Sequence, residues 1–261
     1  MGVIEAIRKG FSVAGKAMAL VAVLFVFNLL GNLASLPFAP EPGAPAAAES
    51  MLPLLLVSIV FIILSVFIQG GSLGLIRDLI KEGKMKLAAM LQYGARYFIR
   101  LLILGIFILA IVLVVAIIAA ILIALTAPLN IPVITGIAAV IAVAIIVVSA
   151  LYFFIPFILS PYAVVCDEVG VIEALKKSIL VGRKPFSRVL ALVLLMLVLI
   201  LIALGVGFLV GLVIGLVSAL LPAGAGRILM IVVSSAVNSY IGVVATSAFM
   251  SYYLVKKESA V

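Results

Sequence analysis

The chain has 261 residues, of which 68% are hydrophobic and 10% are charged, and its formal net charge is +8. Such a composition cannot cover a soluble globule with polar surface, so the sequence predicts an all-α integral membrane protein. With no histidine and one cysteine, Cys166, the chain has neither an internal disulfide nor a histidine acid or base. We expect no His/Cys zinc or haem site, and no cofactor.

Six apolar stretches exceed the roughly 20 residues that a spanning helix needs, and we place them in one transmembrane domain, residues 1–261. The first stretch also resembles a secretory signal peptide. We favour an uncleaved signal-anchor over a cleaved peptide, because the phrase that precedes this stretch recurs at Gly170, deep inside the chain. The six predicted transmembrane helices are residues 17–38, 51–76, 101–127, 133–165, 189–221 and 228–255.

The basic residues are divided unevenly between the ends of these spans. Every Lys and Arg except Arg227 lies in the N-terminal segment, in the two long loops or at the C-terminus. Because cytoplasmic loops carry an excess of Lys and Arg, we expect a multi-pass protein of the cell (cytoplasmic) membrane with both termini in the cytoplasm.

Three basic segments, near residues 3–16, 78–98 and 168–184, have the pattern of cytoplasmic-side amphipathic helices. Their Lys and Arg are placed to meet anionic lipid headgroups, so we expect membrane lipids and not nucleic acid as partners. An equally weighted reading is that the three helices brace the helix bundle. The candidate lipid-facing basic residues are Arg8, Lys9, Lys86, Arg96, Lys176 and Lys177.

A repeated phrase predicts that the chain has a three-fold internal repeat. GVIEAIRK runs over residues 2–9 and GVIEALKK over residues 170–177, a separation of 168 residues, or two steps of 84. One step from Gly2 reaches Lys86, where the middle basic segment begins. We therefore predict units near residues 1–85, 86–169 and 170–261, each a basic helix followed by two spans.

Two stretches carry a family resemblance: GSLGLIRDLIKEGKMKLAAMLQYGARYFIRLL, and FFIPFILSPYAVVCDEVGVIEALKKSILVGRKPFSRVL. They resemble the YciC-type membrane proteins, which are similar to the membrane domain that precedes some glycerophosphodiester phosphodiesterases. The family's acidic-Gly turn and basic helix match residues 167–178. The resemblance covers about residues 70–200 and implies a fold and a membrane location. The hydrolase domain that would carry catalysis is absent from this sequence.

Four side-chain amides within the spans form a candidate intramembrane polar cluster. Amides are costly in hydrocarbon unless they are paired, so they normally face other helices or a wet cavity. The functional reading is a polar path through the bundle, and the simpler reading is hydrogen bonding between helices. No charged residue lies in the middle of a span, which argues against a proton-driven pump. The four amides are Asn28, Asn32, Gln69 and Asn238.

Gly207, Gly211 and Gly215 stand four residues apart on the fifth span. This spacing lets a second helix approach closely, either within the chain or in a homo-oligomer. It is not a phosphate-binding loop, because no Lys-Ser/Thr follows.

Asp167 and Glu168 directly precede the second GVIEA helix. Carboxylates at this position suit the positive end of a helix dipole. Cation binding is the alternative, although two adjacent carboxylates are weak evidence for it. Pro156 and Pro161 are expected to bend or end the fourth span.

Three classes of function follow from these features. The first is a non-enzymatic protein for transport or lipid handling, with the bundle interior as its path. The second is a structural or adaptor protein whose basic cytoplasmic face docks anionic lipids or a partner protein. An intramembrane enzyme ranks last, because the sequence has no GxSxG elbow, no Ser–His pair and no metal cluster.

Overall fold

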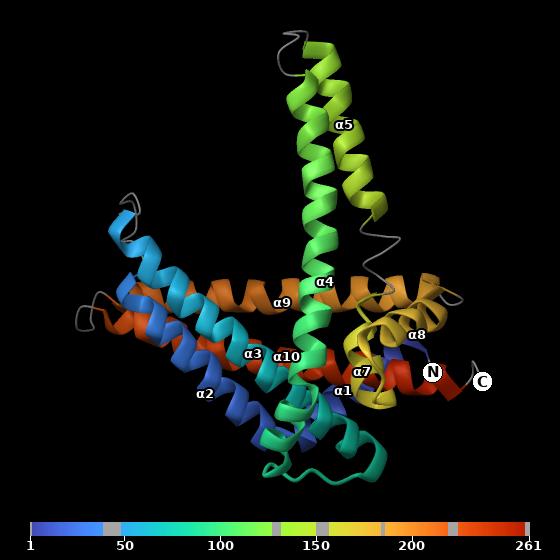
Figure 1. Ribbon diagram of the computed structural model, residues 1–261. Coiled ribbons are helices and arrows are strands. Elements are labelled where there is room, and N and C mark those ends of the chain that lie inside the picture. Colours follow the sequence, from blue (N-terminus) through green and yellow to red (C-terminus); the bar gives the residue numbers. More distant parts are fainter. Residues whose placement is uncertain are drawn as a thin grey trace.

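The computed structural model describes residues 2–38, 48–126, 132–149, 157–183, 186–218 and 224–258. Within these residues the chain is all-α, with helices joined by short turns and no strand (Figure 1). Pro156, which was expected to bend or end the fourth span, lies outside the described residues.

Five helices of the described chain are long and apolar enough to cross a membrane, as expected for a multi-pass membrane protein. Each coincides with a predicted span and extends beyond it or falls slightly short. These helices are α2 (Met18–Ser35), α3 (Ala48–Glu82), α4 (Ala89–Thr126), α9 (Phe186–Ser218) and α10 (Ala225–Glu258).

The fourth predicted span, residues 133–165, is not one long helix in the described chain. It comprises α5 (Pro132–Ser149), which is apolar but short, and α7 (Ser160–Asp167). Pro161 lies in the first turn of α7. Proline suits that position, because the first residues of a helix have no partner for a backbone N–H. Pro161 thus lies at the beginning of a helix, whereas the sequence analysis expected it to bend or end the fourth span.

Two of the three predicted basic helices are separate elements, α1 (Val3–Lys16) and α8 (Val171–Arg183). The prediction of a separate middle helix was wrong. Residues 78–82 end α3, residues 83–88 connect it to α4, and residues 89–98 are the first turns of α4 itself. Nothing in residues 89–98 stops the helix, since they contain no proline and their one glycine, Gly94, packs against Phe67 of α3.

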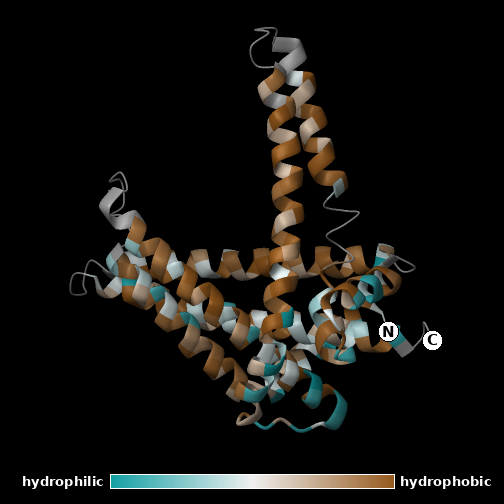
Figure 2. Ribbon diagram, viewed as in Figure 1, coloured by the Kyte–Doolittle hydropathy of each residue, from teal (hydrophilic) through white to brown (hydrophobic). Residues whose placement is uncertain are grey.

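The long helices do not form the closed bundle that the sequence suggested. The first turns of α4 pack on α3, but beyond them the hairpin of α4 and α5 stands apart from α2, α3, α9 and α10 (Figure 1). Figure 2 shows that the visible sides of α4, α5 and α9 are mostly hydrophobic. Their large side chains are exposed, as at Leu109, Val140 and Leu216. A helix that is apolar on every face is suited to lipid as its solvent.

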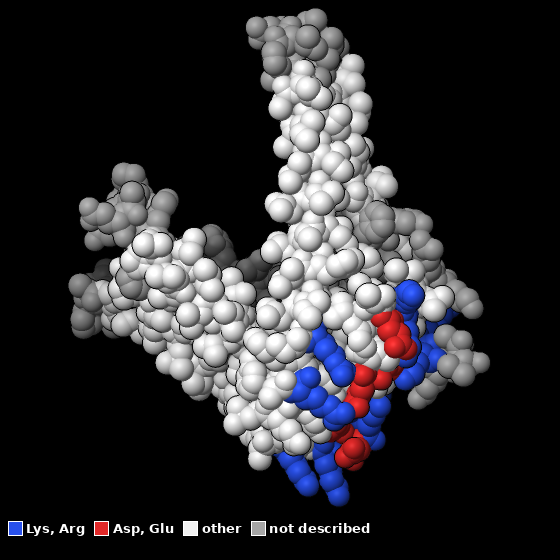
Figure 3. Space-filling view, viewed as in Figure 1, with Lys and Arg blue, Asp and Glu red and all other residues white. Residues whose placement is uncertain are grey.

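The packed core lies where α1, α7 and α8 meet the ends of the long helices. We call this end the base. Figure 3 shows that the Lys, Arg, Asp and Glu side chains visible in this view gather there. Charge is costly within hydrocarbon, so the base marks one end of the spans.

Small residues let the helices of the base approach closely. A Cβ added at Gly10 of α1 would lie 2.6 Å from the backbone oxygen of Val244 in α10. A Cβ added at Gly71 of α3 would lie 2.6 Å from the backbone oxygen of Met90 in α4. Both neighbours are backbone atoms, so neither contact is relieved by moving a side chain.

The contact at Gly10 gives a test of this packing. Gly10→Ala should lower the unfolding temperature in detergent, because overpacking costs about 1–3 kcal/mol. Gly15→Ala is the matched control, since a Cβ there meets nothing within 4 Å and the change raises helix propensity by about 1 kcal/mol. Equal unfolding temperatures for the two variants would contradict the close approach of α1 and α10.

Candidate functional site

Polar side chains of α2, α3 and α10 face one another between these three helices. On α3 the serines recur every seven residues, so they form one stripe along the helix. Ser58 donates to the carbonyl of Leu54 (2.7 Å) and Ser65 to that of Ile62 (2.7 Å), which satisfies their hydroxyl protons within the helix. We call this set the polar seam: Asn28, Asn32, Ser58, Ser65, Gln69, Ser72, Ser235, Asn238, Ser239 and Thr246.

Two hydrogen bonds join α2 to α10 along the polar seam. The amide nitrogen of Asn28 donates to the hydroxyl of Ser239 (2.9 Å), and that of Asn32 donates to the hydroxyl of Ser235 (3.0 Å). Interhelical hydrogen bonding, the simpler of the two readings, therefore accounts for one N–H group of each asparagine. Such bonds stabilise packed membrane helices by about 0.6–2 kcal/mol each.

Two hollows open beside these bonds. One, of about 340 Å³, is lined by Asn28, Asn32 and Asn238 together with Ser58 and Ser65. The other, of about 190 Å³, is lined by Asn28, Ser65, Gln69, Ser72 and Thr246. The four amides of the predicted cluster therefore all line one hollow or the other, and Asn28 lines both.

Two of the four amides are not used by the protein itself. Asn238 and Gln69 are exposed, and within the described residues neither makes a hydrogen bond. An unpaired amide in an apolar environment costs about 1–3 kcal/mol on protein scales. These side chains gain free energy from any hydrogen-bonding group that reaches them.

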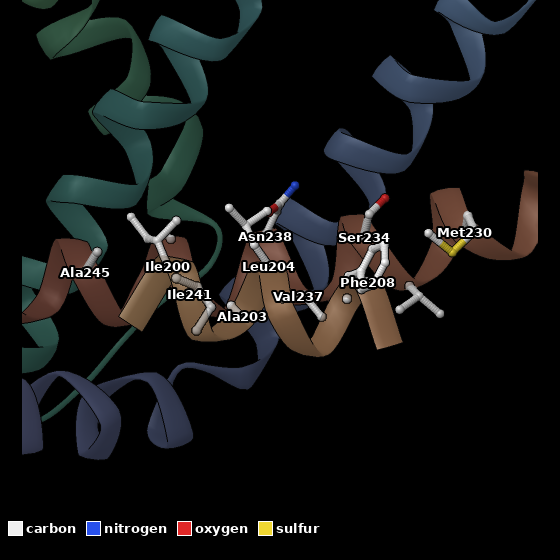
Figure 4. Close-up of a pocket in the computed structure, with 13 residues that line it drawn as sticks. Ile200, Ala203, Leu204, Phe208, Met230, Ser234, Val237, Asn238, Ile241 and Ala245 are labelled. Atoms are coloured by element: carbon white, nitrogen blue, oxygen red, sulfur yellow. The ribbon is translucent and has the colours of Figure 1, made fainter. Parts of the chain in front are cut away.

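An apolar groove of about 550 Å³ lies between α9 and α10 (Figure 4). It is lined by side chains such as Leu204 and Phe208 of α9 and Ile241 of α10, with Asn238 and Ser234 as its polar members. Asn238 therefore belongs both to this groove and to the larger hollow of the polar seam.

The glycines of α9 do not make the close helix contact that their spacing suggested. Cβ atoms added at Gly207 and Gly215 would meet no described atom within 4 Å, and one at Gly211 would meet only the end of the Met230 side chain, at 3.0 Å. A flexible methionine holds α9 and α10 apart here. Gly207 instead helps to line the groove.

Glu168 lies between α7 and α8 and accepts hydrogen bonds from α3 and α4. Its carboxylate is 3.1 Å from Arg77, 2.6 Å from Arg96 and 3.2 Å from the Tyr97 hydroxyl. Its backbone oxygen accepts from Arg100 (2.8 Å), and its φ of 57° is left-handed.

Asp167 turns to the opposite side and is bound by α8 and α10. Its carboxylate is 2.5 Å from Lys257, 2.9 Å from the Tyr253 hydroxyl and 3.4 Å from Lys177. Its side chain is only 2% exposed. We call Asp167 and Glu168 the acidic junction, because the two neighbours join helices on both sides of α7.

Sequence reasoning placed the acidic junction at a helix N-terminus and missed its partners, which lie up to 91 residues away in the chain. Burial acts to raise the pKa of Asp167, but hydrogen bonds from Lys257 and Tyr253 outweigh it, and the pKa is lowered. Burial likewise opposes charge on Glu168, and hydrogen bonds from Tyr97 and Arg77 lower its pKa. Both carboxylates are therefore ionised at neutral pH.

The six candidate lipid-facing cations divide into two groups. Arg96 and Lys177 are ion-paired with the acidic junction, so for these two the prediction misses their main partner. The other four are exposed, and within the described residues none of them lies in a salt bridge: Arg8, Lys9, Lys86 and Lys176. No group of three or more potential metal ligands occurs in the described chain.

Comparison with known proteins gives one result. DUF7847, a domain of unknown function, matches residues 1–255, so the chain belongs to that family. No curated protein and no solved structure matches the chain.

Removing the charge of Asp167 tests the acidic junction. Asp167→Asn should lower the unfolding temperature in detergent by about 5 °C, since it leaves Lys257 and Lys177 without their buried anion, at a cost of about 2 kcal/mol. Glu173→Gln is the matched control, because Glu173 pairs with the same Lys177 (3.3 Å) but is 59% exposed. An equal effect of both variants would contradict the role of burial.

The lowered pKa of Asp167 also predicts how stability depends on pH in wild type and in Asp167→Asn. Because the pKa of Asp167 is lowered on folding, its contribution to stability is full above the unfolded value, roughly 3.9, and is lost as the pH falls through the folded value. Wild type should therefore lose stability below about pH 4 more steeply than Asp167→Asn. Parallel curves would reject this assignment.

Proposed function

We propose that this member of the DUF7847 family is a non-enzymatic protein of the cell membrane that handles or transports a lipid, which it binds at the polar seam. The observation that carries the proposal is the position of Asn238, which lines both a polar hollow and the apolar groove between α9 and α10. A polar and an apolar site that share one residue match a molecule with a headgroup and a chain.

The chemistry of the polar seam supports binding more than catalysis. Its lining side chains are amides and hydroxyls, which form hydrogen bonds but do not exchange protons near neutral pH. The unpaired amides of Asn238 and Gln69 favour a ligand that supplies hydrogen bonds within hydrocarbon. A lipid reaches this site sideways from the bilayer, because the helices around it have exposed apolar surfaces.

We also propose six spans with both termini in the cytoplasm. The end of α3, the start of α4 and the end of α10 are all bound to the acidic junction, at the base. The chain leaves the base along α4 and is back at the base in α7. Figure 1 shows α5 alongside α4, which supports a sixth crossing in the stretch that the sequence predicted as the fourth span.

The burial of side chains supports three repeated units with a step of 84 residues. In each basic segment the same three positions are buried. The middle position is glycine or serine in all three segments, and at Gly10 and Gly94 a larger side chain would force a neighbouring atom to shift. Each segment also packs on the second predicted span of another unit: α1 on α10, the start of α4 on α3, and α8 on α7, at the end of the fourth span. The matching buried residues are Ala6, Gly10 and Val13, then Met90, Gly94 and Tyr97, then Ala174, Ser178 and Val181.

A distant kinship with YciC-type membrane proteins, and with the membrane domain of some glycerophosphodiester phosphodiesterases, is part of the proposal. It is supported by the motif at residues 167–178. The first two residues of that motif form the acidic junction, so the motif has a structural role in holding the base together.

The alternative function is an adaptor whose basic face docks anionic lipids or a partner protein. The observation that favours it is the outer surface of α1 and α8, where Ile4 is 78% and Ile172 is 72% exposed. The exposed cations Arg8 and Lys176 lie one turn along each helix. An apolar side chain beside free cations suits a membrane surface.

Cysteine labelling tests the topology. In a Cys166→Ser background, Arg227→Cys should react with a membrane-impermeant maleimide on intact cells, because Arg227 lies at the end of α10 away from the base. Lys84→Cys, in the turn between α3 and α4, should react only after permeabilisation. Labelling of both positions on intact cells would contradict cytoplasmic termini.

Lipid retention tests the proposed function. Native mass spectrometry of the protein in mild detergent should detect bound lipid in wild type and about fivefold less in Asn238→Leu, because one net hydrogen bond is worth about 1 kcal/mol. Gln92→Leu is the matched control, an exposed amide on α4 outside the seam. Equal retention in Asn238→Leu and wild type would favour the adaptor.

A further inference from the structure

We infer that the lipid bound at the polar seam has an uncharged headgroup that carries hydroxyl groups, as diacylglycerols and glycolipids do. This inference rests on the proposed function and names the ligand class for the same site. It excludes anionic phospholipids such as phosphatidic acid as the bound species.

The first argument is the charge of the lining. Among the described residues, no Asp, Glu, Lys or Arg lines either hollow of the seam. Asn28 is the eleventh of 18 residues in α2, near the middle of the span. A phosphate held there would lie in hydrocarbon without a counter-charge, which is strongly unfavourable.

The second argument concerns the nearest cation on α3. Ile76 lines the smaller hollow, and Arg77 follows it directly. The Arg77 side chain is only 12% exposed, and its guanidinium already binds Asp78 (3.1 Å), Glu168 (3.1 Å) and the Tyr97 hydroxyl (2.8 Å). This arginine is bound to Glu168 of the acidic junction and is not free to pair with a headgroup phosphate.

The third argument is the match of donors and acceptors. Asn28 and Asn32 each donate one N–H to a serine of α10, so each retains one N–H and its carbonyl oxygen. The amides of Gln69 and Asn238 likewise present both donors and an acceptor. A hydroxyl both donates and accepts and can satisfy each of these groups, whereas a phosphodiester only accepts and an ammonium only donates.

The shape of the site places the rest of the lipid. From Asn238 the groove between α9 and α10 continues along apolar side chains such as Leu204 and Phe208 (Figure 4). Its volume of about 550 Å³ is of the size of a site for a small molecule or for part of an acyl chain. The headgroup then lies in the larger hollow, which shares Asn238.

Photolabelling with two matched lipid probes, in separate samples, distinguishes the uncharged from the anionic lipid class. The full-length protein is reconstituted in phosphatidylcholine vesicles with either a photoactivatable diacylglycerol or the matching photoactivatable phosphatidic acid, with the photoreactive group on the glycerol-proximal part of one chain. Labelled peptides are mapped by mass spectrometry. We expect peptides of α2 and α10 to be labelled at least fivefold more by the diacylglycerol.

Variants keep this test independent of folding. Asn238→Leu should reduce labelling by the diacylglycerol, and Asn238→Gln, which keeps an amide, should retain most of it. Gln92→Leu should label as wild type does. Equal reduction by Asn238→Gln and Asn238→Leu would overturn the hydrogen-bonding role of the amide.

The outcomes distinguish this inference from the proposed function. Equal or stronger labelling of α2 and α10 by the phosphatidic acid overturns the uncharged class and leaves lipid handling in place. Absence of labelling in α2 and α10 by both probes overturns the proposed function itself. Preferential labelling by the diacylglycerol supports both.

Discussion

The acidic junction is the interaction on which the rest of the structure depends. Asp167 and Glu168 are adjacent, yet one carboxylate is bound from α8 and α10 and the other from α3 and α4. The left-handed backbone at Glu168 directs the two side chains to different partners. These ion pairs hold the end of α3, the start of α4 and the end of α10 together at the base.

This arrangement separates two kinds of polar group. At the base, cations and carboxylates pair with each other, and the protein uses them to hold itself together. Within the spans, the polar groups are neutral, and Gln69 and Asn238 are not paired with other described side chains. Beyond the base, the hairpin of α4 and α5 diverges from the other long helices (Figure 1), and Gln69 and Asn238 are exposed, so these amides of the seam lie where lipid has access.

The sequence was informative where a signal is local. Long apolar runs predicted α2, α3, α4, α9 and α10, and the rarity of amides in them identified four side chains that line adjoining hollows. Signals between distant residues were not available. The partners of Asp167 and Glu168 lie in four other helices, and a pair of acidic residues does not specify them. Glycine spacing shows only that a close approach is sterically allowed. The close approaches occur at Gly10 and Gly71, and not along Gly207, Gly211 and Gly215.

The two asparagine–serine bonds have a consequence for how firmly the helices of the polar seam are held against one another. Asn28 and Asn32 are four residues apart, as are Ser235 and Ser239, and the two bonds pair them in antiparallel order. A slide of about 6 Å along the helix axis would therefore leave only one such bond. A smaller slide breaks both bonds, so the two bonds together oppose sliding of α2 against α10. Within the described residues, α3 meets α2 through rings such as Phe27 and Phe61 and through no hydrogen bond. Aromatic contacts tolerate gradual displacement, so α3 is held against α2 less rigidly than α10 is.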